Sequence, residues 1–219
     1  MKIRVLGMSL LAMALIPFFA QCNKPTIGID ISRHNNKIDW DAPELQDVEF
    51  CYIKLTQGDW RIDPMAGKHA ENARKKGMKV GFYHYYGTSS TGEEQFEVFK
   101  AQLAKHSMDL IPVIDVESLD NDFSDKKKIR RDVSVIIERF KEEYGYYPIV
   151  YFGNIPAYIV WPLSHKCKKW YRTVGVPKFL QKKGFQQTEV KLVNGQRTDF
   201  DICSDLSSLM LPSDVTQED

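Results

Sequence analysis

Two hydrophobic patterns alternate along the chain: short apolar runs and longer amphipathic stretches. The runs are rich in Ile, Val, Tyr and Phe and cover residues 26–31, 48–55, 79–86, 110–116 and 148–152. This composition is typical of β-strands, and nearly continuous apolarity is expected where both faces of a strand are covered. The pattern predicts five buried strands. It also favours shorter strands at 169–173, 185–190 and 198–202, followed by a closing turn at 206–211.

Between these runs, apolar residues recur three or four positions apart, which is the spacing of one face of a helix. The repeats are Ala66, Ala70 and Ala73, then Phe96, Phe99 and Leu103, then Ile129, Val133, Ile136 and Phe140. Gly77 and Gly145 follow the first and third repeats, where they are typical helix ends. Alternating strands and helices predict an α/β fold of repeated βα units around a mainly parallel sheet or barrel.

The N-terminal segment has a different character. Lys2 and Arg4 precede an apolar stretch at 5–20 that ends just before Cys22, as in a bacterial lipoprotein signal, where the cysteine becomes the lipidated first residue. Ordinary signal cleavage and a retained anchor are the alternatives, whereas a spanning helix is disfavoured because the stretch is short and contains Pro17. We expect a signal at 1–22, one catalytic domain at 23–212 and a loose tail at 213–219.

Charge and cysteine content exclude several classes of protein. The 30 basic and 29 acidic residues nearly cancel without forming blocks, which argues against nucleic acid as a partner. No CxxC spacing exists, so neither a zinc nor an iron–sulfur site is expected. Cys51 fits a buried position in a strand. Pairing of Cys167 with Cys203 is compatible with export and is left open.

Polar residues gather where the predicted strands end, at Asp30, Lys54 and Thr56, His84, Asp115 and Glu117, and Tyr151. In an α/β barrel the carboxyl ends of the strands form one rim, so these side chains are predicted to share a site. Each has a structural alternative: a turn residue for Asp30, a stem lying along apolar surface for Lys54, a core position for His84. Their joint placement favours a site.

Asp115 and Glu117 carry the chemistry of this hypothesis. Because side chains alternate along a strand, both face the same way, and two neighbouring carboxyl groups raise the pKa of one of them. Glycosidic cleavage needs such an acid on the leaving oxygen and a second negative group near the cationic transition state. Capping of a helix or binding of a cation is the alternative. Aromatic residues near the strand ends, among them Tyr83, Tyr151 and Trp170, suit stacking against sugar rings.

The ordered motifs resemble those of glycoside hydrolase family 25, the Chalaropsis-type lysozymes or N-acetylmuramidases. They are Gly28-Ile29-Asp30-Ile31-Ser32, Ile38-Asp39-Trp40, Tyr52-Ile53-Lys54-Leu55-Thr56-Gln57-Gly58, Gly81-Phe82-Tyr83-His84 and Pro112-Val113-Ile114-Asp115-Val116-Glu117. The resemblance spans residues 27–202 and implies a flattened, incomplete TIM-like β/α barrel. Residues 33–36 read Arg-His-Asn-Asn where the family has His-Trp-Gln-Gly, and Gln57 replaces a glutamate.

The resemblance also implies roles for individual residues. Glu117 matches the general acid/base and Asp115 its partner carboxylate, while Asp30 and Asp199 match further acids of the site. Substrate contacts are expected from Lys54, Tyr83, His84, Tyr151 and Gln186. The implied reaction cleaves the β-1,4 bond after N-acetylmuramic acid in peptidoglycan, with help from the substrate's own acetamido group and without a metal or other cofactor.

We therefore expect an exported, monomeric lysozyme of the bacterial cell envelope that acts on peptidoglycan and is held at the membrane by lipid on Cys22. Nucleic acid is not an expected partner. Hydrolysis of another N-acetylated glycan, or glycan binding without catalysis, are the alternatives. The departures at 33–36 and 57 alter residues of the rim, and they leave the decoration of the glycan open.

Overall fold

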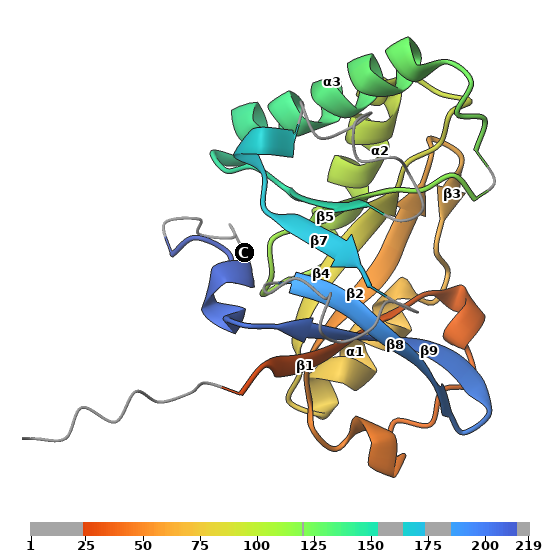
Figure 1. Cartoon of the computed structure of the whole chain (residues 1–219), viewed down its shortest axis with the longest axis vertical. Helices are drawn as coiled ribbons and strands as arrows, with labels where there is room; N and C mark the ends of the chain where they lie inside the picture. The colour runs from red at the N-terminus through yellow and green to blue at the C-terminus, as the bar shows by residue number, and fades with distance from the viewer. Residues whose placement is uncertain (1–23, 120, 153–163, 174–184, 214–219) are drawn as a thin grey trace, which may run out of the picture.

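Eight strands close into a barrel in the computed structural model, which describes residues 24–119, 121–152, 164–173 and 185–213 (Figure 1). The strands are β1 (Thr26–Ile31), β2 (Val48–Gln57), β4 (Lys79–Tyr85), β5 (Val113–Val116), β6 (Ile149–Phe152), β7 (Lys169–Arg172), β8 (Phe185–Val193) and β9 (Gln196–Cys203). The order around the barrel is β1-β9-β8-β7-β6-β5-β4-β2, and β2 pairs with β1 to close it. A two-residue strand, β3 (Arg61–Ile62), pairs with the end of β2.

One strand runs against the other seven. β9 is antiparallel to β8 and to β1, whereas the remaining pairs in the barrel are parallel. Asn194 and Gly195 make the β8–β9 turn with φ of 46° and 79°, the left-handed geometry of a tight hairpin. This return strand places Asp199 directly opposite Asp30 on β1.

Among the described residues, three α-helices pack on the outside of the barrel: α1 (Ala66–Lys75), α2 (Gly92–Leu103) and α3 (Lys126–Tyr144). Thr91 and Glu94 form a capping box at the start of α2, and Gly145 ends α3 with φ of 75°. The apolar faces of α2 and α3 meet through three phenylalanines. The ring centroid of Phe140 on α3 lies 5.6 Å from that of Phe96 and 5.6 Å from that of Phe99, both on α2. The two helices lie side by side in Figure 1.

The barrel interior is aromatic, while the layer between strands and helices is mainly aliphatic. Alternation along β2 directs Phe50, Tyr52 and Lys54 inward and Cys51 and Ile53 outward. The inner cluster includes Trp170 stacked on Phe185 at a centroid distance of 4.4 Å. These rings fill the barrel beneath its open end and form a rigid floor for the polar residues above.

The α/β barrel predicted from the sequence is confirmed, with its five main strands, three weaker strands and three helices. β3 was not predicted, because two exposed residues give no hydrophobic pattern. Cys51, Cys167 and Cys203 are buried free thiols, so the Cys167–Cys203 pairing left open above does not occur in this structure. Cys22 lies outside the described residues, as do the expected signal segment and most of the tail.

Within the described ranges, none of the helices combines the length and apolarity required to cross a membrane.

Candidate active site

A pocket of about 270 Å³ opens at the carboxyl ends of the parallel strands. Seven of the sequence-predicted site residues line it: Asp30, Lys54, Tyr83, Asp115, Glu117, Tyr151 and Asp199. The remaining lining residues are Ser32, Arg33, His34, Gln57, Arg61, Tyr85, Leu119, Trp170 and Gln187. The rim of a barrel thus brings together residues from β1, β2, β4, β5, β6 and β9 that are far apart in sequence.

The two central carboxyl groups follow from the alternation of β5. Asp115 and Glu117 face the pocket, whereas Val116 between them is fully buried in the outer core. Asp115 is only 8 % exposed, and its Oδ1 has no hydrogen-bond partner among the described residues. Glu117 is half-buried, so it is the member of the pair that a ligand in the pocket reaches more readily.

A second acidic pair lies on β1 and β9. Asp30 is the cross-strand partner of Asp199, and Asp201 lies opposite Gly28 on the same ladder. Asp201 is fully buried, with its Oδ1 accepting a hydrogen bond from Trp170 Nε1 at 3.1 Å. It was not among the predicted site residues, although alternation from Asp199 across Phe200 would have placed it on the inner side.

Burial dominates the electrostatics of these acids. It raises the pKa of Asp115 well above its usual value, the Glu117 carboxylate raises it further, and Lys54 opposes the shift. Burial also raises the pKa of Glu117, against the lowering effects of the Arg172 guanidinium and the Tyr151 hydroxyl. Protonated carboxyl groups are therefore favoured in this pocket at a pH where free acids are ionised, which general-acid catalysis requires.

The pKa values of the acids on β1 and β9 are raised as well. Burial raises the pKa of Asp30, and Asp201 and Asp199 add to the effect. The pKa values of Asp199 and Asp201 are likewise raised by burial. Like charges directly opposite one another destabilise a sheet, so this arrangement works against folding and points to a functional requirement. No three of the described His, Cys, Asp and Glu side chains are arranged to hold a metal ion.

Tyr151 connects the carboxyl pair to β8. Its hydroxyl lies 3.0 Å from Gln187 Oε1 and also forms a hydrogen bond that lowers the pKa of Glu117. A hydroxyl has one proton and can donate it to only one of these oxygens. In the structure the hydroxyl donates to Gln187 Oε1, so Tyr151 joins β6 to β8 beside Glu117.

The loop after β5 is fastened to the loop after β4 by Asn121. Its Nδ2 donates to the carbonyl oxygens of Tyr86 and Glu117, each at 2.9 Å, and its Oδ1 accepts from Thr88 N at 2.9 Å. The Tyr85 hydroxyl donates to Leu119 O at 2.5 Å in the same loop. These bonds hold the backbone that carries Glu117.

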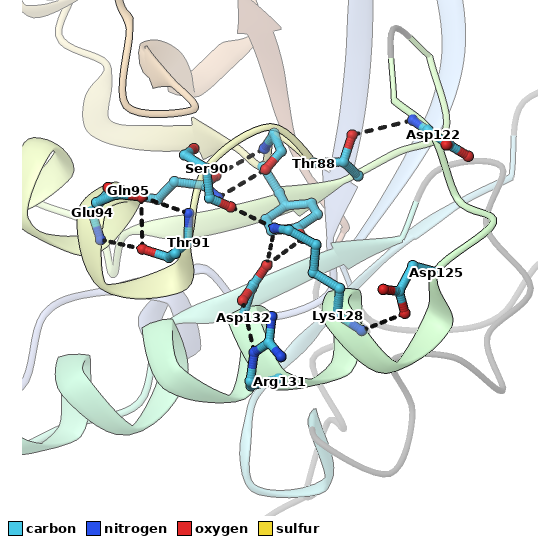
Figure 2. Close-up of polar contacts among 12 residues, drawn as sticks. Thr88, Ser90, Thr91, Glu94, Gln95, Asp122, Asp125, Lys128, Arg131 and Asp132 are labelled. Atoms are coloured by element: carbon cyan, nitrogen blue, oxygen red, sulfur yellow. Dashed lines mark hydrogen bonds and ion pairs between the residues drawn. The ribbon is translucent and has the colours of Figure 1, made fainter.

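A buried polar network supports the β4 loop from the helix side (Figure 2). Asp132 on α3 is 2 % exposed, and its Oδ2 lies 2.5 Å from Lys128 Nζ and accepts from the Tyr86 hydroxyl at 3.1 Å. Lys128 Nζ also donates to Ser90 O at 2.6 Å. Of the three consecutive lysines at the start of α3, Lys128 therefore belongs to this network, while Lys126 and Lys127 are exposed.

Two predicted substrate contacts are corrected by the phase of their strands. His84 alternates with Tyr83 and Tyr85 and faces α2 instead of the pocket; it is fully buried against Phe99. Its ring nitrogens lie 2.8 Å from Thr56 Oγ1 and 3.0 Å from Gln95 Oε1, and burial lowers its pKa to about 4. His84 is a neutral core histidine.

Gln186 is the second correction. It is 1 % exposed and absent from the pocket lining, whereas its neighbour Gln187 lines the pocket and bonds Tyr151. A one-residue difference along a strand exchanges the two faces. On β8 it is therefore Gln187, and not Gln186, that faces the pocket.

The chain belongs to the glycosyl hydrolases family 25, whose family model matches residues 29–159. This segment contains Asp30, Asp115 and Glu117; Asp199 lies beyond it, on the strand that pairs with β1. The chain is 29 % identical over 133 residues to the uncharacterized protein YegX of Escherichia coli K12, covering 58 % of this chain and 48 % of that protein. It is 33 % identical over 90 residues to the autolytic lysozyme of Clostridium acetobutylicum, covering 41 % and 28 %.

The chain therefore matches about half or less of the length of these curated relatives. The match to solved structures is more complete. A family 25 glycosyl hydrolase from Bacillus anthracis superposes with a TM-score of 0.67 at 26 % identity, over 84 % of this chain and 93 % of that one. Most of the chain thus has a counterpart in a solved member of the family.

Proposed function

We propose that this protein is a lysozyme-type glycoside hydrolase that cleaves the β-1,4 bond after N-acetylmuramic acid in peptidoglycan. The observation that carries this proposal is a pair of carboxyl groups that line one open pocket and have raised pKa values: Asp115 on β5 and Glu117 directly after it. Membership of the glycosyl hydrolases family 25 and the likeness to an autolytic lysozyme support the choice of reaction and substrate.

In the proposed mechanism Glu117 gives its proton to the glycosidic oxygen as the bond to the anomeric carbon breaks. The acetamido oxygen of the same sugar attacks that carbon, while Asp115 stabilises the positive charge that develops on the acetamido group. A water molecule then attacks the anomeric carbon, returns the acetamido group to its original form and gives a proton back to Glu117. The half-buried position of Glu117 and the deeper position of Asp115 fit these roles.

The substrate experiment compares purified peptidoglycan with chitin oligomers, scoring turbidity and release of reducing ends. The proposal predicts cleavage of peptidoglycan and little cleavage of chitin. Preferential cleavage of chitin would indicate a hydrolase of another N-acetylated glycan. Binding of peptidoglycan without release of reducing ends would indicate a glycan-binding protein and would refute the enzymatic proposal.

We also propose that the protein is exported and anchored through lipid on Cys22. The support is the sequence pattern, because Lys2 and Arg4 precede the apolar stretch that ends beside this cysteine. Two acyl chains give stable anchoring where one gives only marginal binding. Labelling with a fatty-acid probe should mark the wild type and leave Cys22→Ser unmarked. An unmodified mature N-terminus at another residue would contradict the anchor without affecting the enzymatic proposal.

We expect the anchored enzyme to act as a monomer. Light scattering of a form that starts after Cys22 tests this expectation, and a stable dimer would contradict it.

A further inference from the structure

One wall of the pocket is basic. Arg33 and His34 follow β1, Lys54 lies near the end of β2, and Arg61 lies on β3. β1 and β3 both pair with β2, so the four side chains occupy one quadrant of the rim. We call these four residues the basic wall. Carboxyl groups reach the same pocket from β1, from β5 and the residue after it, and from β9, so the basic wall faces acids across the pocket.

The arginines of the basic wall have no anionic partner among the described residues. Neither guanidinium forms a salt bridge there, and Arg33 Nη1 is buried without a hydrogen-bond partner. The carboxylate of Asp63 lies nearby, but its oxygens accept from the backbone N–H groups of Arg33 and Met65, both at 2.9 Å. Lys54 donates a hydrogen bond to the uncharged Gln57 at 2.8 Å and lies 4.2 Å from the ring centre of Tyr85, while the Asp115 carboxylate favours its charged form.

The closeness of these basic groups disfavours the charged form of each of them. Burial lowers the pKa of Lys54 to about 8, and the Arg33 and Arg61 guanidinium groups contribute to that lowering against the opposing effects of Asp115 and Asp63. Burial and then Arg33 and Lys54 lower the pKa of His34. Gln57 stands where the family resemblance leads one to expect a glutamate, which would have supplied a negative charge beside Lys54. Lys54 is buried, Arg33 is half-buried, and His34 and Arg61 are exposed, so an anion brought by a ligand can reach the wall and offset the repulsion among its cations.

We propose that the basic wall binds a carboxylate carried by the glycan, next to the sugar whose linkage is cut. This inference rests on the proposed function and adds a requirement for charge on the substrate. A carboxylate suits the site because a guanidinium can hold both of its oxygens with parallel hydrogen bonds. In peptidoglycan two sources exist: the lactyl group of muramic acid, which is charged where the peptide is absent, and the carboxyl groups of the stem peptide.

The experiment uses four forms of one glycan: peptide-free with its lactyl carboxyl free, the same material methyl-esterified, peptide-bearing, and peptide-bearing with its carboxyl groups amidated. We expect the wild type to prefer a charged form over its neutral counterpart by roughly tenfold or more in kcat/KM, since hydrogen bonds to charged groups are worth about 1.5–3 kcal/mol. The charged form that is preferred identifies the source. The preference should shrink at high ionic strength.

The variant Arg33→Gln/Arg61→Gln should lose most of this preference, mainly through an increased KM on the charged form. Lys127→Gln removes an exposed cation from α3 and should keep the wild-type preference. Equal kcat/KM on charged and neutral forms, or a preference that survives in the double variant, would overturn the basic wall as a carboxylate site.

Failure of the proposed function is recognised separately. If none of the four glycans is cleaved, calorimetric titration of the unaltered protein with the muramic acid-containing disaccharide and its methyl ester still measures the charge preference. Tighter binding of the free acid that is lost in the double variant would support the basic wall alone. Equal binding of acid and ester would contradict it.

Discussion

Replacing Asp201 by asparagine should stabilise the protein at neutral pH. The carboxyl group is fully buried, its Oδ1 accepts from Trp170 Nε1 at 3.1 Å, and its Oδ2 has no hydrogen-bond partner among the described residues. Burial raises its pKa well above the usual value, and the negative charge of Asp199 raises it further. The native environment therefore disfavours the ionised form that dominates in the unfolded chain at pH 7.

The size of the effect follows from what the substitution keeps and removes. Asparagine retains an oxygen for Trp170, has nearly the same volume and carries no charge. The amide nitrogen that replaces Oδ2 also lacks a partner, so the gain comes from removing the buried charge, and Asp201→Asn should increase the free energy of unfolding by roughly 1–3 kcal/mol. For a domain of this size the gain corresponds to an increase in Tm of roughly 2–10 °C.

The stabilisation should depend on pH with a definite sign. The folded-state pKa of Asp201 lies above the unfolded value of about 3.9, so the stabilising effect of the protonated carboxyl is present below that value. It is lost as the pH rises through the folded-state pKa, whereas asparagine does not titrate. The difference between variant and wild type should thus be small at pH 4, grow as the pH rises and then level off.

Urea unfolding at several pH values between 4 and 8 measures this difference. Asp47→Asn, at an exposed position, is the matched control and should change stability little at any pH. The reasoning fails if Asp201→Asn destabilises the protein at pH 7, or if its effect is the same at pH 4 as at pH 7.

Two further variants test the positions around the site. Between pH 6.5 and pH 4, His84→Gln should lose about 3 kcal/mol less of its free energy of unfolding than the wild type. A histidine with a lowered pKa stabilises the fold above its unfolded-state pKa, and this effect is lost as the pH falls to about 4. Equal losses for the two proteins in urea unfolding would contradict the neutral core histidine. Asn121→Ala should lower kcat by about 10-fold to 100-fold with a smaller change in KM, because the backbone of Glu117 loses its tether. Asn72→Ala on α1 is the control, and a change confined to KM would refute a positioning role.

The barrel and its carboxyl pair could be predicted from local patterns. The strand runs are continuous and apolar, and Asp115 and Glu117 are two residues apart on one strand, so their common direction does not depend on the rest of the fold. The assignment of faces on other strands was less secure. Tyr83 and His84 were both expected in the site although neighbours in a strand point opposite ways, and the same ambiguity separated Gln186 from Gln187.

The closing of the barrel by strands far apart in the sequence could not be predicted from local patterns. The antiparallel return of β9 depends on the hairpin at Asn194 and on pairing with β1, and this pairing is what sets Asp199 against Asp30 and buries Asp201. The basic wall depends on β3, a strand too short and too exposed to leave a hydrophobic pattern. Arg61 could not be assigned to the pocket without it.

The central claim is that Glu117 supplies the proton for cleavage after N-acetylmuramic acid. The most direct test incubates purified peptidoglycan with wild-type protein and with Glu117→Gln, reduces the new ends with borohydride and identifies the reduced sugar by mass spectrometry. We predict reduced N-acetylmuramic acid from the wild type and a rate lower by roughly 100-fold to 10,000-fold from the folded Glu117→Gln variant. Reduced N-acetylglucosamine as the product, or comparable rates for the two proteins, would contradict the account.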